Sequence, residues 1–124
     1  MIDLILVGSG SFLGGNARYI LATFIANRFG SAFPYGTLII NVTGSLVIGV
    51  LLTYILERSN LNPNYRLVFV VGFLGAYTTF STYTFDALTL MQDGQWFRSI
   101  IYLVGTVALG MICVAGGMLV GRNI

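Results

Sequence analysis

Hydroxyl groups are concentrated in one short stretch of an otherwise apolar chain. The segment GAYTTFSTYTF, residues 75–85, carries seven hydroxyls in eleven residues, whereas 56% of the chain is hydrophobic and 8% is charged. One or two such hydroxyls could bond to carbonyls of the preceding helical turn, but seven exceed what that explanation accounts for. Because Gly72 and Gly75 weaken the helix just before them, we expect an interrupted helix with exposed carbonyls near Gly75 to Thr78.

Other side chains within apolar stretches could act on an ion, and two of them have two interpretations each. Arg18, in GGNARYI, either extends to the nearer membrane interface or places a positive charge at a water-filled vestibule. Asn41 either makes a helix–helix hydrogen bond or presents its amide donors to a polar path. Phe80 and Tyr83, three residues apart, can share a helix face, and the positive edges of their rings can solvate an anion.

The elements that position these groups are expected to cross a membrane. A soluble domain has about a quarter of its residues charged, but this chain of 124 residues has six arginines, four acidic residues, no lysine and no histidine. Four apolar stretches meet the requirement of about 20 residues for a spanning helix: 4–25, 37–56, 67–91 and 97–120. We therefore predict one all-α domain over residues 1–124, with four transmembrane helices, the third broken in mid-membrane. The first stretch lacks a basic start and a cleavage site, so we expect it to be retained.

Catalytic chemistry is not expected. Without histidine, and with Cys113 as the single cysteine, the chain cannot assemble a zinc cluster, a Ser-His triad or a Cys-His pair. Its few carboxylates are widely spread. We predict a protein that is not an enzyme, that is surrounded by a lipid bilayer and that has no nucleic-acid partner.

The arginines are nearly balanced between the two sides of the membrane. With the N-terminus inside, one side receives Arg58, Arg66 and Arg122, and the other receives Arg28 and Arg98, with Arg18 in the first helix. Positive charge normally sets orientation, so a chain without that bias can insert both ways. Four helices also leave no room for an enclosed aqueous pore. Both observations favour a homodimer of the chain with an inverted copy of itself.

The motifs GGNARY, GTLIINVTGSLVIG and GFLGAYTTFSTYTFD resemble, in order and spacing, the signatures of the Fluc (CrcB-type) family of fluoride ion channels. The likeness covers the whole chain and includes the DGQW loop. It implies a dual-topology, antiparallel homodimer with two narrow fluoride pathways in the plasma or inner membrane. Such a channel exports fluoride passively from the cytoplasm and lowers its toxicity.

The resemblance also implies roles for individual residues. The carbonyls of Gly75 and Thr78 from both subunits would hold a central structural sodium ion. Asn41 would donate to fluoride, and Phe80 would offer a ring edge to its path. A polar track beside that path would include Ser81, Thr82 and Tyr102. Arg18 would have a vestibule or structural role.

Two positions depart from the family pattern or fit it loosely. Tyr83 stands where the family usually has a second phenylalanine, so the ring edge is kept and a hydroxyl is added. Whether Tyr83 belongs to the fluoride pathway is therefore open. Asp86 falls where relatives carry an acid, often the longer glutamate, and its role is open as well.

Two alternative functions compete with a channel. A small dual-topology multidrug/proton antiporter has the same size and charge balance, and it would use Asp86 as the carboxylate within a span. A non-transporting assembly subunit would explain the small-residue packing pairs along the helices, but it would leave the hydroxyl cluster unexplained.

Overall fold

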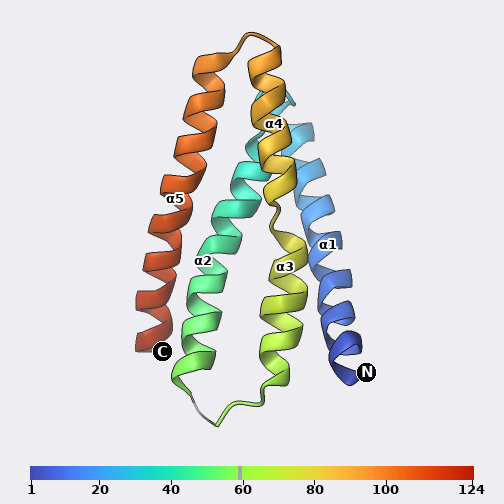
Figure 1. The fold of residues 1–124 in the computed structure, drawn as a ribbon, viewed down its shortest axis with the longest axis vertical. Coiled ribbons are helices and arrows are strands. Elements are labelled where there is room, and N and C mark those ends of the chain that lie inside the picture. Colours follow the sequence, from blue (N-terminus) through green and yellow to red (C-terminus); the bar gives the residue numbers. More distant parts are fainter. Residues whose placement is uncertain (59) are drawn as a thin grey trace.

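A computed structural model describes residues 1–58 and 60–124 of the chain, and every regular element within them is a helix (Figure 1). In chain order these are α1 (Ile2–Phe29), α2 (Tyr35–Glu57), η1 (Arg66–Leu74), α3 (Gly75–Tyr77), α4 (Phe80–Gln92) and α5 (Trp96–Asn123). The third predicted helix is thus divided, with a break between α3 and α4. This confirms an all-α fold with an interrupted third helix.

Each of the four apolar stretches of the sequence lies within this set of helices. Among the described residues, three helical segments are long and apolar enough to cross a membrane: Tyr35–Glu57, Arg66–Gln92 and Trp96–Asn123. Helix α1 is as long as α5, at 28 residues, but it includes Asn16 and Arg18, which make it less apolar. Its assignment as a fourth span stays a prediction.

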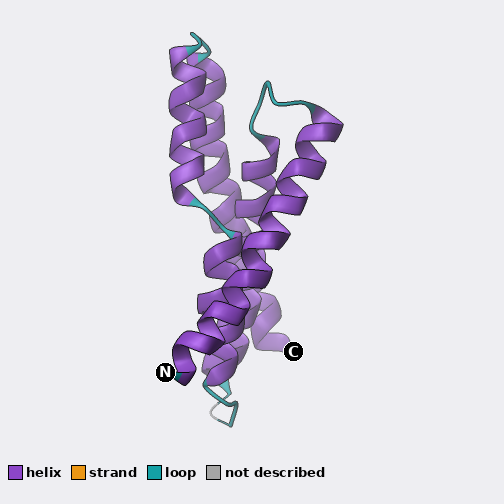
Figure 2. Cartoon of the chain, turned by 90° about the vertical axis from the view of Figure 1, so that its right-hand side faces the viewer, coloured by secondary structure: helices purple, strands orange, loops and turns teal. Residues whose placement is uncertain are grey.

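The α1, α2, η1–α4 and α5 segments run in alternating directions along the molecule, so both chain ends lie at the same end of it (Figure 1). Helix α2 packs mainly along α5, whereas α1 packs mainly along η1 and α3. Above the break, the pair formed by α4 and α5 diverges from the upper parts of α1 and α2 (Figure 2). The break therefore lies where the helices change neighbours.

Glycines bring the helices of each pair into close contact. A Cβ atom on Gly117 of α5 would overlap the carbonyl oxygen of Leu46 in α2, and one on Gly14 of α1 would overlap the carbonyl oxygen of Phe73 in η1. Lipid supplies no hydrophobic drive between helices, so close backbone contact of this kind is a main source of their association. The ends of α2 and α5 are also joined by Glu57 and Arg122.

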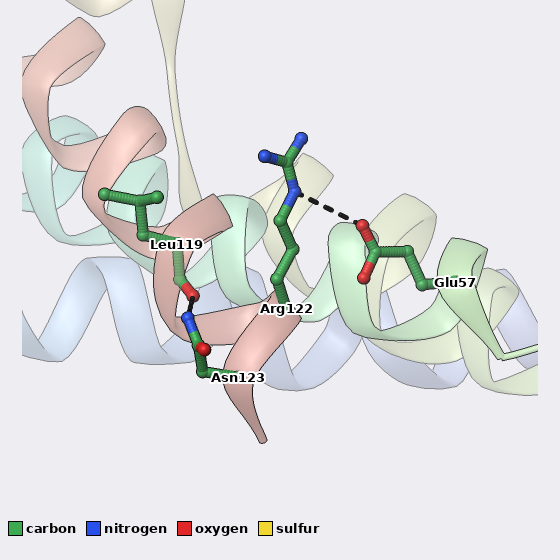
Figure 3. Close-up of polar contacts among 4 residues, drawn as sticks. All are labelled: Glu57, Leu119, Arg122 and Asn123. Atoms are coloured by element: carbon green, nitrogen blue, oxygen red, sulfur yellow. Dashed lines mark hydrogen bonds and ion pairs between the residues drawn. The ribbon is translucent and has the colours of Figure 1, made fainter.

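That ion pair has an N–O distance of 3.3 Å (Figure 3). Its side chains are about half exposed, at 54% for Arg122 and 48% for Glu57. An exposed pair of this kind contributes less than about 1 kcal/mol. The glycine contacts, rather than the ion pair, hold α2 against α5.

Large apolar side chains cover much of the outer surface of the chain. Aromatic rings are exposed near both ends: Phe29, Tyr35, Trp96 and Phe97 at one end, and Tyr65 and Phe69 at the other. Tyrosine and tryptophan are enriched at the two membrane–water interfaces. So large an apolar surface is compatible with lipid but not with water, and the small internal core centres on Tyr83, Ala87, Leu90 and Tyr102.

Candidate functional site

The break consists of two threonines with extended backbones. Thr78 has φ −80° and ψ 160°, and Thr79 has φ −152° and ψ 124°. The Thr79 hydroxyl caps α4 by accepting a hydrogen bond from the Thr82 N–H at 3.3 Å, as threonine does at many helix starts. The Thr78 hydroxyl donates to the carbonyl of Leu74 at 2.9 Å. The hydroxyls of this segment support the break, as the sequence predicts.

Asn41 of α2 clamps the break from across the helix interface. Its Nδ2 donates to the carbonyl oxygen of Thr79 at 2.9 Å, and its Oδ1 accepts from the Thr79 N–H, also at 2.9 Å. The amide oxygen thus replaces the partner that the Thr79 N–H loses at the break. The amide nitrogen adds a second donor to the Thr79 carbonyl, which as the N-cap carbonyl also accepts the first hydrogen bond of α4. Of the two interpretations of Asn41, the helix–helix hydrogen bond is the one observed. One N–H of the amide has no partner within residues 1–58 and 60–124, and donation to an ion stays a prediction for that group.

The carbonyls just before the break lose their helical hydrogen-bond donors because the backbone is extended at Thr78 and Thr79. In a continuous helix the Thr79 N–H would bond to the carbonyl of Gly75, but here it bonds to Asn41. The carbonyl oxygen of Thr78 lies 3.5 Å from Nη1 of Arg18. Arg18 therefore extends toward the break and not toward the nearer membrane interface.

The break borders an open groove of about 680 Å³ that is lined by α2, by the divided third helix and by α5. Its polar lining includes Asn41, Thr78, Thr79 and Thr106, and its wall is otherwise mainly apolar. Phe80 also lines the groove, and 76% of its surface is exposed. The backbone groups of the break and the exposed ring of Phe80 therefore line the same groove.

Tyr83 lies beside Phe80, with the ring centroids 6.0 Å apart. The side chain is buried, and its hydroxyl donates to the carbonyl oxygen of Leu103 at 2.6 Å. The added hydroxyl of this position is thus used for packing α4 against α5. The ring still lines the groove, so its role in the fluoride pathway stays a prediction.

A second polar cluster surrounds Asp86. Its Oδ2 accepts a hydrogen bond from the Thr37 hydroxyl at 2.7 Å and another from the Tyr102 hydroxyl at 3.3 Å. Thr37 and Asp86 also line a smaller pocket of about 230 Å³ below the loop between α1 and α2. Tyr102 was predicted for a polar track beside the fluoride path, but within one chain its hydroxyl contacts Asp86 and the residue does not line the groove. Thr37 was not predicted. A hydroxyl at the start of an apolar stretch was the only signal for it.

The remaining predicted residues, Ser81 and Thr82, lie on the exposed first turn of α4 and not in the lining of the groove. The Thr82 hydroxyl accepts from the Thr79 hydroxyl at 3.1 Å. Within one chain, the structure thus places both residues beside the break and away from the groove that contains Asn41 and Phe80.

Thr106 was also missed, and it is the most unusual polar group of the site. The residue is 6% exposed, and its hydroxyl has no hydrogen-bond partner within the described part of the chain. It lies one helical turn from Tyr102 and lines the groove. A hydroxyl four residues after a predicted site residue, on the same helix, was a signal that could have identified it. A buried hydroxyl without a partner is costly, which marks Thr106 as a candidate ligand-binding group.

Comparison with known proteins identifies the family. The family model described as "CrcB-like protein, Camphor Resistance (CrcB)" matches residues 5–118. The chain belongs to the CrcB-like family. Every residue of the CrcB-like site described above, from Arg18 to Thr106, lies within the matched region. The similarity and the three long apolar helices identify a multi-pass membrane protein.

Curated relatives of this CrcB-like chain are named "Fluoride-specific ion channel FluC". One from Chloroflexus aurantiacus is 43% identical over 122 residues, which are 98% of this chain and 97% of the relative. One from Rhizobium meliloti is 40% identical over 122 residues, or 98% of each chain. One from Trichormus variabilis is 46% identical over 119 residues, which are 95% of this chain and 87% of the relative.

Proposed function

We propose that this CrcB-like protein is a fluoride-selective passive channel through which fluoride leaves the cytoplasm. The observation that carries the proposal is the helix break at Thr78 and Thr79, held by Asn41 beside a groove. Thr106 lines this groove, and its buried hydroxyl has no partner among residues 1–58 and 60–124. The names of the relatives support fluoride as the ion. They support a channel and not a multidrug/proton antiporter, and they are not names of enzymes.

The chemistry of the site suits a small anion that accepts strong hydrogen bonds. We assign the free N–H of Asn41, the ring edge of Phe80 and the hydroxyl of Thr106 to the path of the ion. Amide, hydroxyl and ring-edge donors can replace the water around fluoride without holding it by a full charge, and weak binding at several sites is what conduction requires. The membrane potential supplies the driving force, about 2.3 kcal/mol per charge for each 100 mV.

A second, inverted copy of the chain is proposed to cover the groove. The groove is open and mainly apolar. The arginines are distributed over both ends of the helices, as a chain that inserts in both orientations requires. With two copies, Ser81 and Thr82 on the exposed turn of α4 could complete a path whose other side belongs to the partner.

A structural sodium ion is proposed for the interface of the two copies, and the residues present fit it. The Gly75 carbonyl has lost its helical partner, because the Thr79 N–H bonds to Asn41. Gly75 itself is exposed, so its carbonyl is accessible to a partner chain. Together with the carbonyl of Thr78 it provides neutral oxygen ligands, which are suited to a monovalent cation. A sodium ion bound there would be coordinated by these carbonyl oxygens and would connect the helix breaks of the two copies.

Ion flux from liposomes tests the proposal. Purified protein is reconstituted with internal potassium fluoride and potassium chloride, and a potassium ionophore sets the voltage while electrodes follow each anion. We expect rapid, voltage-driven loss of fluoride with chloride retained, and no loss from protein-free liposomes. Fluoride retention by correctly folded protein would refute the channel.

The Asp86→Asn variant separates the channel from the antiporter. An antiporter that relies on this carboxylate loses drug transport driven by a pH gradient when the carboxylate is removed. The wild-type protein is expected to show no such drug transport, and its fluoride flux is expected to persist without a proton gradient. Drug transport that depends on Asp86 would instead support the antiporter.

A further inference from the structure

Arg18 contacts the backbone of the break and no carboxylate within the described part of the chain. Its Nη1 lies 3.5 Å from the carbonyl oxygen of Thr78, and the contact is partly buried. Among the described residues the only ion pair is that of Arg122 with Glu57, so no carboxylate lies within 4.0 Å of Arg18. A guanidinium at membrane depth normally pairs with an acid or with backbone carbonyls, and here its partner is the backbone of the break.

The packing of α1 explains why the guanidinium reaches that oxygen. Gly14 lies one helical turn before Arg18, and a Cβ atom there would overlap the carbonyl oxygen of Phe73. The backbones of α1 and η1 are therefore in contact at this level, and the Arg18 side chain extends from the contact toward the residues that follow Phe73. Gly10, one turn earlier, keeps the same close approach against Val68.

We propose that Arg18 regulates the sodium affinity of the break by sharing the carbonyl oxygen of Thr78. This inference rests on the sodium site of the proposed function. A carbonyl oxygen has two lone pairs and can face both the guanidinium and a metal ion. Two positive charges on one oxygen repel each other, and the guanidinium draws electron density from the oxygen. Arg18 thereby weakens the binding of a cation that the break would otherwise hold more tightly.

The distances favour this role over a simple supporting hydrogen bond. A strong N–H to O bond has a heavy-atom distance near 2.9 Å, which Asn41 achieves twice at the same break. The Arg18 contact is longer, at 3.5 Å, so it holds the backbone less firmly than the amide does. Its effect is mainly that of a charge, which acts over this distance with little need for alignment.

Sodium titration of the purified protein tests the proposal without measuring ion flux. Thermal stability is followed as sodium replaces N-methylglucamine at constant ionic strength. For Arg18→Gln, which removes the charge, we expect the apparent sodium dissociation constant to fall by roughly tenfold or more, the size expected for repulsion between unit charges a few ångströms apart. Arg18→Lys keeps the charge and is expected to stay within about threefold of the wild type, since the Coulomb repulsion remains.

Arg28→Gln is the matched control, because it removes the same charge from the last turn of the same helix, where the side chain is exposed. We expect no change in sodium affinity. Arg18→Met is a second neutral variant that keeps the experiment decisive if Arg18→Gln does not fold, because it removes the charge without introducing an amide into the membrane. Both neutral variants are expected to bind sodium more tightly than the wild type.

Sodium affinity that is unchanged or weaker in the folded neutral variants would overturn the proposal, since the contact would then be irrelevant or purely supportive. A wild-type protein that conducts fluoride but is not stabilised by sodium would also overturn the proposal. That result would refute the sodium site and leave the channel assignment intact. Tighter sodium binding in the neutral variants of a protein that does not conduct fluoride would support the role of Arg18 while the channel assignment failed.

Discussion

The Asn41→Ala substitution tests whether this side chain mainly holds the helix break or mainly binds an ion. The amide makes two hydrogen bonds of 2.9 Å to the backbone of Thr79. Alanine removes both. It leaves the partly buried Thr79 N–H without a partner, whereas the Thr79 carbonyl keeps the first hydrogen bond of α4. If Asn41 is the clamp of the break, its loss must therefore reduce the stability of the folded protein as well as its transport.

The size of the effect follows from these two bonds. Leaving the Thr79 N–H unsatisfied costs about 1–3 kcal/mol, and loss of the second bond to the Thr79 carbonyl adds about 0.5–1.5 kcal/mol, so the total is roughly 2–4 kcal/mol. For a protein of this size, that corresponds to a decrease on the order of 10 °C in the unfolding temperature. Fluoride flux is expected to fall by at least about tenfold, since a shift of about 1.4 kcal/mol in the population of the conducting geometry is sufficient for that.

Thermal unfolding and fluoride efflux are measured on the same preparation, at one protein and one sodium concentration, because binding equilibria shift apparent stability. Asn123→Ala is the matched control. Its amide also donates to a backbone carbonyl, that of Leu119 at 2.7 Å, but at the exposed end of α5 (Figure 3). The control is expected to change neither quantity. A variant Asn41→Ala with wild-type stability and no fluoride flux would refute the clamp and leave ion binding as the role of the amide.

Three further substitutions follow from single contacts. Thr106→Val replaces a buried hydroxyl, which has no partner among the described residues, by a methyl group. We therefore expect an unfolding temperature equal to or above that of the wild type, together with reduced fluoride efflux. Unchanged efflux would exclude the hydroxyl from the path. Tyr83→Phe removes a hydroxyl that donates to a backbone carbonyl of α5. The variant is expected to lose about 1 kcal/mol of stability in thermal unfolding and to preserve fluoride efflux. Loss of flux with intact stability would place the hydroxyl in the pathway. Gly117→Val would force a side chain into the backbone of α2, and overpacking typically costs about 1–3 kcal/mol or more. The adjacent Gly116→Val is the control, because no described atom lies within 4 Å of a Cβ at that position, and it should unfold like the wild type. Equal stability of the two variants would contradict the close helix contact.

Much of the fold could be predicted from the sequence because each signal was local. Four apolar stretches with few charges define helices wherever they occur, since a backbone in lipid must satisfy its own hydrogen bonds. The break was predictable for a similar reason, because glycines and hydroxyl side chains cluster within a few residues of it. The observed break, at Thr78 and Thr79, lies at the end of the predicted segment.

The candidate site was predictable only in part. Asn41, Phe80 and Tyr83 line the groove together with Thr78, and their roles toward an ion stay predictions. Thr37 and Thr106 were missed, because an isolated hydroxyl on an apolar helix has no local feature that distinguishes it from one bonded to its own backbone. Ser81 and Thr82 were predicted with the others, yet within one chain they lie outside the groove.

The sequence by itself determined which segments form helices, where one of them is interrupted and which polar groups are available. Only the tertiary structure decided what those groups contact. The amide of Asn41 bonds to Thr79, 38 residues away, and the guanidinium of Arg18 reaches the carbonyl of Thr78, 60 residues away. Helix ends and breaks depend mainly on neighbouring residues, whereas these partners depend on which helices pack together and how closely their glycines allow them to approach.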